Sequence, residues 1–302
     1  MAPSRRERIA VVVCYVTLCV IWGTTYNAIK LAVEVFDPFF YSAVRFILSG
    51  LIMLALGAVL RVPFPRRVAE YVPLVVTGLM LLVAGNGLLS MAAMEVPSGI
   101  TSVISPLAPI VIALMVYFVR GEERLNWSGW IGVLLGAAGV ILIFLEEIQQ
   151  ASLIKARGAL LLMGCCFFWS LASVIQRRYA RLPHPILVAA FQMLSGGLGL
   201  MAVFAFRGAP THAPVTMQAI GAVAYLVIVG GCVGFYCWAY LISKIPVAQA
   251  ATYGYVNPGV ALLIGWMWLG EQFKANQLTG MGLALVGVVI VNFGKRPEAQ
   301  PR

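Results

Sequence analysis

The chain has 302 residues, of which 61% are hydrophobic and 11% are charged, and its formal net charge is +10. Soluble domains are about 45–50% apolar and about 25% charged, so this composition excludes a soluble globular protein and predicts an all-α integral membrane protein embedded in a lipid bilayer. The basic residues stand in short clusters between apolar runs, which favours cytoplasmic loops over a nucleic-acid surface.

A membrane-spanning helix needs about 20 mainly apolar residues, and ten stretches of that kind follow one another along the chain. The first comes after Arg5, Arg6 and Arg8 and is too long for the apolar part of a signal peptide, so we interpret it as a membrane helix. The predicted helices cover residues 9–30, 38–60, 71–94, 98–119, 127–145, 158–179, 185–206, 219–243, 246–269 and 275–293.

The second half of the chain repeats the first in order and at a nearly constant offset. The matched pairs are Trp22 with Trp169, Lys30 with Arg177 and Pro38 with Pro185 at 147; Gly132 with Gly280 and Gly139 with Gly287 at 148; Gly85 with Gly234, Pro97 with Pro246, Pro109 with Pro258 and Gly121-Glu122 with Gly270-Glu271 at 149. We therefore divide the chain into repeats 1–150 and 151–302. Because each holds an odd number of helices, the second must enter the membrane in the opposite sense.

Positive charge predicts the orientation of these helices. With the N-terminus inside, the inner loops and tails hold fifteen Lys and Arg residues and the outer loops hold five, which are Lys30, Lys155, Arg157, Arg207 and Lys274. Cytoplasmic loops carry the excess of Lys and Arg. We therefore expect both termini in the cytoplasm of a bacterium, with the helices in its inner membrane.

Several short motifs together resemble the EamA-type members of the drug/metabolite transporter superfamily. They are Ile21-Trp22-Gly23-Thr24-Thr25, Pro38 with Arg45-Phe46, Pro109 with Gly121-Glu122, and, in the second half, Trp169, Gln192, Pro258 and Gly270-Glu271. The resemblance covers essentially the whole chain and implies ten helices in two inverted five-helix repeats that move small metabolites. Within that family the chain looks most like the amino-acid exporters of the YddG type. It departs from an exact duplication because Gln192 stands where the first half has Arg45.

Two prolines mark the predicted substrate pathway. Pro109 and Pro258 lie inside predicted helices at equivalent positions, and each should leave the carbonyl four residues earlier, on Ser105 or Gly254, without its helical partner. Such a carbonyl must face protein or a water-filled cavity, so paired breakers indicate a transporter's central site. The alternative is a kink that serves packing alone.

Polar and aromatic side chains recur on single faces of the predicted helices, mainly in the third, fourth, eighth and ninth. Each one taken singly is explained as well by helix–helix hydrogen bonding or by an interfacial belt, but as a set they favour a pathway. The predicted substrate-binding residues are Trp22, Tyr26, Asn86, Ser90, Ser105, Pro109, Trp169, Tyr236, Tyr240, Tyr253, Asn257 and Pro258.

Three features receive other interpretations. The glycines of helices 127–145 and 275–293 allow close backbone approach and favour structural packing. Arg45, about two turns into its helix, is either functional or tied to carbonyls at a helix end. The six cysteines lie in apolar runs without metal-ligand spacing, so we predict buried thiols and neither metal nor cofactor.

These patterns favour a secondary transporter over a membrane enzyme, because no nucleophile with a base and no mid-span carboxylate is present. A pathway without a fixed carboxylate suits a neutral or zwitterionic solute rather than a strong cation. We predict transport of amino acids, including apolar and aromatic ones, by alternating access, with the ammonium on freed carbonyls and the side chain on aromatic rings. The alternatives are another metabolite or drug class.

Overall fold

The protein is described by a computed structural model that covers residues 4–95, 107–119, 125–143, 145, 155–179, 184–206, 210–269 and 274–293. Its described parts are helices joined by short connections, with one isolated antiparallel bridge between Phe36 and Thr211. The first half contains α1 (Arg5–Val33), α2 (Pro38–Val59), η1 (Val68–Glu70), α3 (Val72–Gly78), η2 (Leu79–Asn86), α4 (Gly87–Glu95), α6 (Ala108–Phe118) and α7 (Trp127–Ile143).

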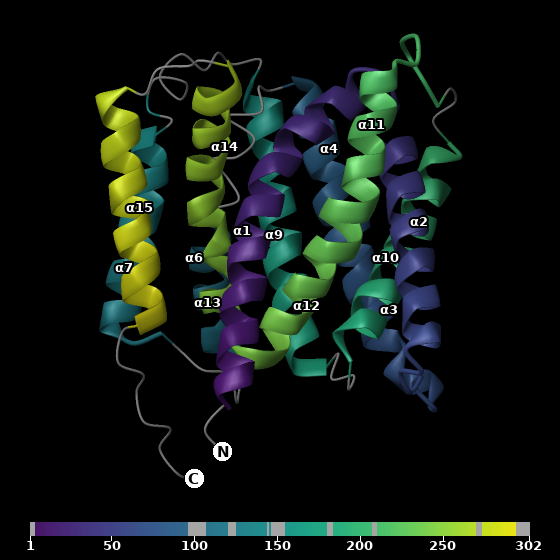
Figure 1. Ribbon diagram of the computed structural model, residues 1–302, viewed down its shortest axis with the longest axis horizontal. Coiled ribbons are helices and arrows are strands. Elements are labelled where there is room, and N and C mark those ends of the chain that lie inside the picture. Colours follow the sequence, from purple (N-terminus) through teal and green to yellow (C-terminus); the bar gives the residue numbers. More distant parts are fainter. Residues whose placement is uncertain are drawn as a thin grey trace.

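The second half follows the same order. It contains α9 (Lys155–Tyr179), α10 (Pro185–Phe204), α11 (Met217–Tyr225), η4 (Leu226–Val233), α12 (Gly234–Lys244), α13 (Val247–Ala251), α14 (Tyr253–Leu269) and α15 (Ala275–Phe293). Figure 1 shows the long helices side by side, with α7 and α15 paired at one edge of the bundle. Helix α1 begins and α15 ends on the same side of the molecule (Figure 1).

In the part of the chain that the structure describes, six helical stretches are long and apolar enough to cross a membrane. Large hydrophobic side chains are exposed on their outer faces, such as Val12 at 60% and Leu198 at 61%. A helix satisfies its own backbone hydrogen bonds, which is what a lipid solvent demands. The chain is therefore an integral membrane protein. The six stretches are Arg5–Val33, Pro38–Val59, Val68–Glu95, Arg157–Tyr179, Pro185–Phe204 and Met217–Lys244, and the shorter apolar helices are Ala108–Phe118, Trp127–Ile143 and Ala275–Val291.

Helices α2 and α10, which are equivalent in the two halves, begin with the same type of N-terminal cap. Asp37 Oδ1 accepts from the backbone N–H of Phe39 at 2.8 Å and Pro38 opens α2. His184 Nδ1 accepts from the backbone N–H of Ile186 at 3.3 Å and Pro185 opens α10. A side-chain acceptor followed by proline satisfies the free N–H groups of the first turn and fixes where each helix starts.

Helices α2 and α10, which are equivalent in the repeat, pack against each other reciprocally. A Cβ on Gly50 would lie 2.7 Å from Leu194 Cγ, and a Cβ on Gly197 would lie 2.9 Å from Ile47 Cγ1. Gly50 is equivalent to Gly197 and Ile47 to Leu194 at the offset of 147. Gly50 therefore contacts Leu194, and the two residues equivalent to them, Gly197 and Ile47, contact each other in the same way. Reciprocal contacts of this kind are those expected about a two-fold axis.

Helices α7 and α15 repeat this relationship. A Cβ on Gly132 would lie 2.8 Å from the carbonyl oxygen of Gly287, and one on Gly139 would lie 2.6 Å from that of Gly280. The partner's number falls as the residue's own number rises, so these equivalent helices run antiparallel. The glycines permit backbone contact, as the interpretation of the two glycine-rich helices requires.

The third helix of each half contains a π-helical segment, η2 in the first and η4 in the second. Such segments are rare, widen the helical turn and occur frequently at functional sites. Each is followed directly by an α-helical segment, η2 by α4 and η4 by α12.

The two marker prolines differ in their setting. Pro258 lies inside α14, as predicted, and removes the helical partner of the Gly254 carbonyl. Pro109 instead lies in the first turn of α6, where the missing N–H is an unpaired group in any helix, so it is not the interior breaker that we expected. The carbonyl of Ser105 falls outside the described residues.

Candidate functional site

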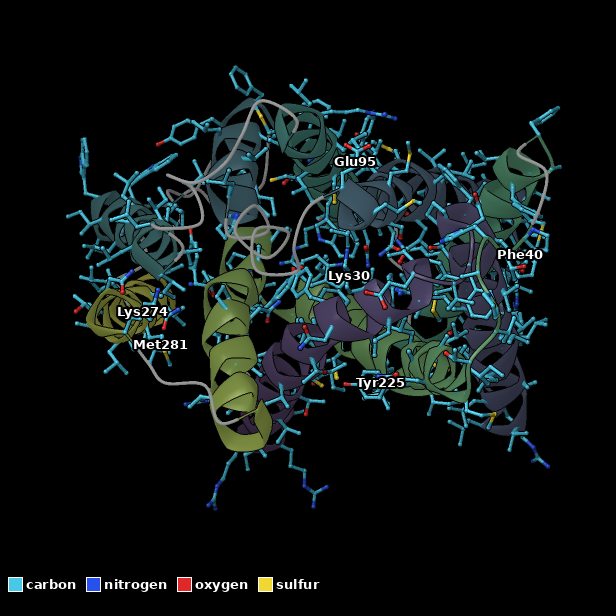
Figure 2. All side chains as sticks on the ribbon, turned by 90° about the horizontal axis from the view of Figure 1, so that it is seen from above. Lys30, Phe40, Glu95, Tyr225, Lys274 and Met281 are labelled. Carbon is cyan, nitrogen blue, oxygen red and sulfur yellow. The ribbon has the colours of Figure 1, made fainter. Side chains whose placement is uncertain are left out.

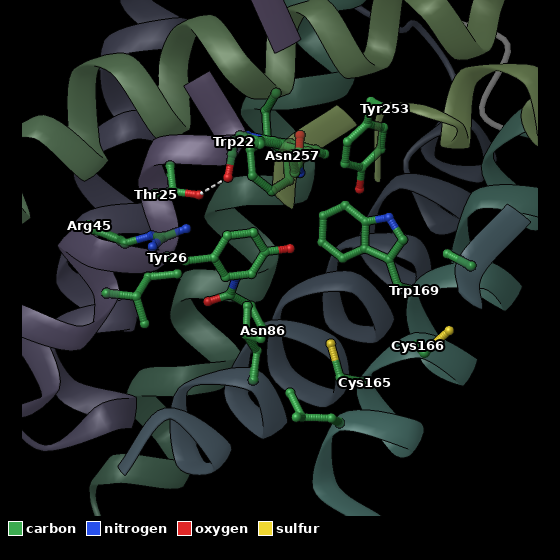
Figure 3. Close-up of a pocket in the computed structure, with 15 residues that line it drawn as sticks. Trp22, Thr25, Tyr26, Arg45, Asn86, Cys165, Cys166, Trp169, Tyr253 and Asn257 are labelled. Carbon is green, nitrogen blue, oxygen red and sulfur yellow. Dashed lines mark hydrogen bonds between the residues drawn. The ribbon is translucent and has the colours of Figure 1, made fainter. Parts of the chain in front are cut away.

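One cavity is lined by residues from both halves of the chain (Figure 3). The space within it that the centre of a water-sized sphere can reach is about 80 Å³. Both halves supply its wall. The lining residues are Trp22, Thr25, Tyr26, Ile29, Arg45, Asn86, Leu89, Ala108, Leu162, Cys165, Cys166, Trp169, Phe235, Tyr253 and Asn257.

Aromatic rings form one part of this wall. Trp22 packs edge-to-face against Trp169 with ring centroids 5.4 Å apart and against Tyr253 at 4.9 Å. Phe235 packs against Trp169 at 6.1 Å. These rings come from four different helices, and edge-to-face pairs add about 0.5–1.5 kcal/mol each to the burial of the rings. The cluster therefore presents a firm apolar surface to a ligand.

The two equivalent tryptophans differ in their hydrogen bonding. Trp22 Nε1 donates to the carbonyl oxygen of Gly230 at 3.3 Å. Trp169 Nε1 is buried and has no partner. A buried donor without a partner costs about 1–3 kcal/mol, so the two equivalent tryptophans differ in stability as well as in bonding.

Arg45 is the one charged residue among the described lining residues, and only 3% of it is exposed. Its Nε and Nη1 have no hydrogen-bond partner, and its guanidinium lies 4.2 Å from the centroid of the Phe46 ring. Cation–π contact contributes about 2 kcal/mol when desolvated, whereas a buried, unpaired charge costs several kcal/mol. Of the two interpretations of Arg45, the structure does not support a tie to backbone carbonyls at a helix end.

Neutral polar groups complete the wall. Asn86, the last residue of η2, is 5% exposed and its Oδ1 has no partner. Asn257 donates from its amide nitrogen to the carbonyl oxygens of Tyr253 at 3.0 Å and Cys19 at 3.1 Å. Thr25 Oγ1 donates to the Trp22 carbonyl at 2.9 Å (Figure 3). The free oxygen of Asn86 thus offers an acceptor to a ligand.

Among the described residues that line the cavity there is no carboxylate and no histidine. Within the described ranges, no group of three or more His, Cys, Asp or Glu side chains has an arrangement that suits a metal ion. The chemistry that the wall offers is therefore ring stacking, hydrogen bonding and one positive charge.

The structure brings half of the predicted substrate-binding residues to the cavity. Those on its wall are Trp22, Tyr26, Asn86, Trp169, Tyr253 and Asn257. Among the others, Ser90 is buried between Tyr41, whose hydroxyl is 2.7 Å from its own, and Ser42, at 3.2 Å. Tyr236 and Tyr240 stack on each other with ring centroids 6.4 Å apart. Pro109 and Pro258 are buried, and Ser105 lies outside the described residues.

Other residues of the wall escaped the sequence-based prediction, notably Thr25, Cys165 and Phe235. The expected pathway lay mainly in the third, fourth, eighth and ninth helices, but α1 and α9 line much of the cavity. Helical spacing from the two tryptophans was the available signal. Counting three, four and seven residues forward from Trp22 gives Thr25, Tyr26 and Ile29, and counting back by four and seven from Trp169 gives Cys165 and Leu162.

Comparison with known proteins gives a consistent result. The model of the EamA-like transporter family matches residues 9–145 and 156–293. An uncharacterized inner membrane transporter of Escherichia coli K12, YedA, is 30% identical over 282 residues, which are 92% of this chain and 89% of the relative. A probable terminal-alkyne amino-acid exporter of Streptantibioticus cattleyicolor is 25% identical over 296 residues, 93% of each chain.

A solved crystal structure has a similar fold, with a TM-score of 0.77 over 94% of this chain and 96% of the other. The two sequences are 22% identical, so this likeness concerns the fold alone.

Proposed function

This chain belongs to the EamA-like transporter family, and we propose that it is a secondary transporter of amino acids, including aromatic and apolar ones. The observation that carries this proposal is the cavity between the two repeats, which is lined by aromatic rings, an asparagine with a free oxygen and one unpaired cation. An α-amino acid supplies an apolar or aromatic side chain together with one group of each charge.

The proposed architecture is ten membrane spans in two inverted repeats, residues 1–150 and 151–302, with both termini in the cytoplasm. It is supported by the antiparallel packing of α2 on α10 and of α7 on α15, which are equivalent helices. It is also supported by the position of the beginning of α1 and the end of α15 on one side of the molecule. Figure 2 looks at the molecule from above, the end opposite the two chain ends in Figure 1, and labels Lys30, which we expect to lie outside.

Alternating access follows from this arrangement. A site between two inverted halves opens to one side of the membrane when the halves rock in one direction and to the other side when they rock back. The aromatic contacts between Trp22 of the first half and Trp169 and Tyr253 of the second cross the boundary that must move. Substrate then binds where the halves meet and travels without a continuous pore.

Export across the inner membrane is the proposed direction, supported by the names of two relatives, an inner membrane transporter and a probable amino-acid exporter. Coupling through an intramembrane carboxylate has no support in the described part of the cavity wall, which contains neither Asp nor Glu. The amino-acid gradient itself, or ions at another place, then drives net flux.

Counterflow in proteoliposomes tests the proposed function. Vesicles loaded with unlabelled amino acid should accumulate external radiolabelled L-phenylalanine and L-leucine, and vesicles without protein should not. A panel of sugars serves as the comparison class. Exchange of sugars in the absence of amino-acid exchange would contradict the proposed substrate.

A further inference from the structure

We propose that Arg45 holds the carboxylate of the transported solute, so that a free carboxylate is a required group of the substrate. This inference rests on the proposed function and specifies which part of an amino acid the cavity recognises. It begins from the position of Arg45, whose guanidinium lies on the cavity wall with two nitrogens unbonded.

Acidic residues in the described part of the chain are occupied or exposed elsewhere. Glu7 pairs with Lys244 at 2.9 Å, and Glu95 pairs with Arg157 at 3.3 Å. Asp37 caps α2, and Glu34 and Glu70 are exposed. The remaining acidic residues, Glu122, Glu123, Glu146, Glu147, Glu271 and Glu298, lie outside the described residues, and in the sequence they stand between or after the apolar runs. None of the described acidic residues therefore forms an ion pair with Arg45, and its positive charge is available to a bound ligand.

The geometry of a guanidinium selects the class of ligand. Its planar fork of N–H groups matches a carboxylate in a bidentate pair, and such charge-assisted bonds are stronger than neutral ones. Burial strengthens the pair further, because a low-dielectric site screens charge poorly. A solute that brings its carboxylate to Arg45 therefore supplies the counter-charge and the hydrogen-bond acceptor that the protein does not provide to this guanidinium.

The rest of the wall suits the other parts of an α-amino acid. In the view of Figure 3, Arg45 and Trp169 lie on opposite sides of Tyr26, and Asn86 lies beside Tyr26. The unpartnered Oδ1 of Asn86 accepts a hydrogen bond from an ammonium group. The ring cluster around Trp169 takes an apolar or aromatic side chain.

The repeat shows that this anion subsite exists once. The residue equivalent to Arg45 is Gln192, which is buried and donates from Nε2 to Thr77 Oγ1 at 2.8 Å. Gln192 is not among the residues that line the cavity. The two halves therefore share a pair of tryptophans but only one cation, and the cavity binds its substrate in one orientation.

The test is ligand-dependent thermal stabilisation of the purified protein in detergent, which needs no transport. The probes are L-phenylalanine, its amide, which lacks the carboxylate charge, and phenethylamine, which lacks the whole group. L-Phenylalanine should bind the native protein at least tenfold more tightly than either analogue. In the Arg45→Gln variant this preference should fall to less than threefold, and Arg45→Lys should retain part of it.

Arg177→Gln is the matched control, because Arg177 donates to the carbonyl oxygen of Ile242 at 2.5 Å and lies outside the cavity wall. It should keep the full preference. The proposal is overturned if native protein binds the acid and the amide equally, a measurement that stands even when Arg45→Gln fails to fold. It is also overturned if inorganic phosphate binds at Arg45 while the affinity for L-phenylalanine does not depend on that residue.

These results separate the inference from the proposed function. Binding of L-phenylalanine and its amide with equal affinity refutes the role of Arg45 and leaves amino-acid transport standing. Absence of binding by every amino acid, together with absence of counterflow, refutes the proposed function.

Discussion

Trp22 of α1 and Trp169 of α9 occupy equivalent positions in the two repeats and contact each other edge-to-face at the wall of the cavity, with ring centroids 5.4 Å apart. A glycine of the opposite half backs each of them. A Cβ on Gly234 would lie 2.4 Å from Trp22 Nε1, and one on Gly85 would lie 3.6 Å from Trp169 Cε3. The tighter of these contacts fixes the position of Trp22.

We expect Gly234→Ala to displace the Trp22 indole, because the added methyl group and the ring cannot occupy the same space. Overpacking of this kind costs about 1–3 kcal/mol, and it should lower both the thermal unfolding temperature in detergent and the rate of counterflow. Gly221→Ala is the control, since nothing lies within 4 Å of the Cβ that it adds. Equal unfolding temperatures for the two variants would contradict the described packing of Trp22.

A second prediction concerns the pair formed by α7 and α15. A Cβ on Gly139 would lie 2.5 Å from the backbone nitrogen of Ala284, and backbone cannot turn aside as a side chain can. Gly139→Ala should therefore separate the two helices and lower the thermal unfolding temperature by several degrees.

The control for this pair is Gly282→Ala on α15, which adds a Cβ to open space. Alanine is the better helix former by about 0.8–1.0 kcal/mol, so this variant should be neutral or slightly more stable. A Gly139→Ala protein that unfolds at the same temperature as Gly282→Ala would show that the two helices do not touch at this point.

The proposed topology makes a third prediction. In a protein whose six native cysteines have been replaced, Arg157→Cys should react in intact cells with a thiol reagent that does not cross the membrane, because Arg157 is exposed and lies outside in this topology. Ser243→Cys, also exposed, should react only after the cells are opened. The reverse pattern would invert the topology, and reaction of both in intact cells would refute the odd number of spans, three, that we predict between the two sites.

Energy coupling provides a fourth prediction. Glu95 is the carboxylate that α4 carries at its end, and its pair with Arg157 is largely exposed, so the pair contributes little stability. Glu95→Gln should leave amino-acid uptake into proteoliposomes unchanged, with or without an imposed pH gradient. Loss of pH-driven accumulation in this variant alone would establish the carboxylate coupling that we predict to be absent.

The described helices were largely predictable from the sequence, because a lipid solvent requires long apolar runs and the runs can be read directly. Proline and an acceptor side chain at the start of α2 and α10 made their first residues clear. The repeat also predicted which helices are equivalent, and the reciprocal contacts of Gly50 and Gly197 agree with that equivalence.

The cavity was only partly predictable. Trp22 and Trp169 are aromatic residues at equivalent positions of the two repeats, and Asn257 is an amide residue next to Pro258. All three lie on the cavity wall. Tyr236 and Tyr240 were assigned to the pathway on the assumption that residues 219–243 form an unbroken α-helix. The π-helical segment η4 (Leu226–Val233) interrupts that helix and changes the face on which the later residues lie. Nothing in the sequence alone marks such a segment.

The role of Arg45 was the other open point. Its position two turns into α2 suited either a cavity or a tie between helices. Only the packing of α1, α2 and η2 around one space places Arg45 on the wall. Contacts between distant parts of the chain, rather than local pattern, decide this.

Counterflow of L-phenylalanine by a protein whose cavity has been filled tests the central claim most directly. Ala108 is buried on the cavity wall, and Ala138 is exposed on α7, so Ala108→Phe fills the proposed site and Ala138→Phe adds the same ring outside it. In proteoliposomes, the native protein and Ala138→Phe should exchange L-phenylalanine, while a folded Ala108→Phe protein should lose at least nine-tenths of the exchange. Exchange at the native rate by Ala108→Phe, with its fold verified, would contradict the assignment of this cavity as the amino-acid pathway.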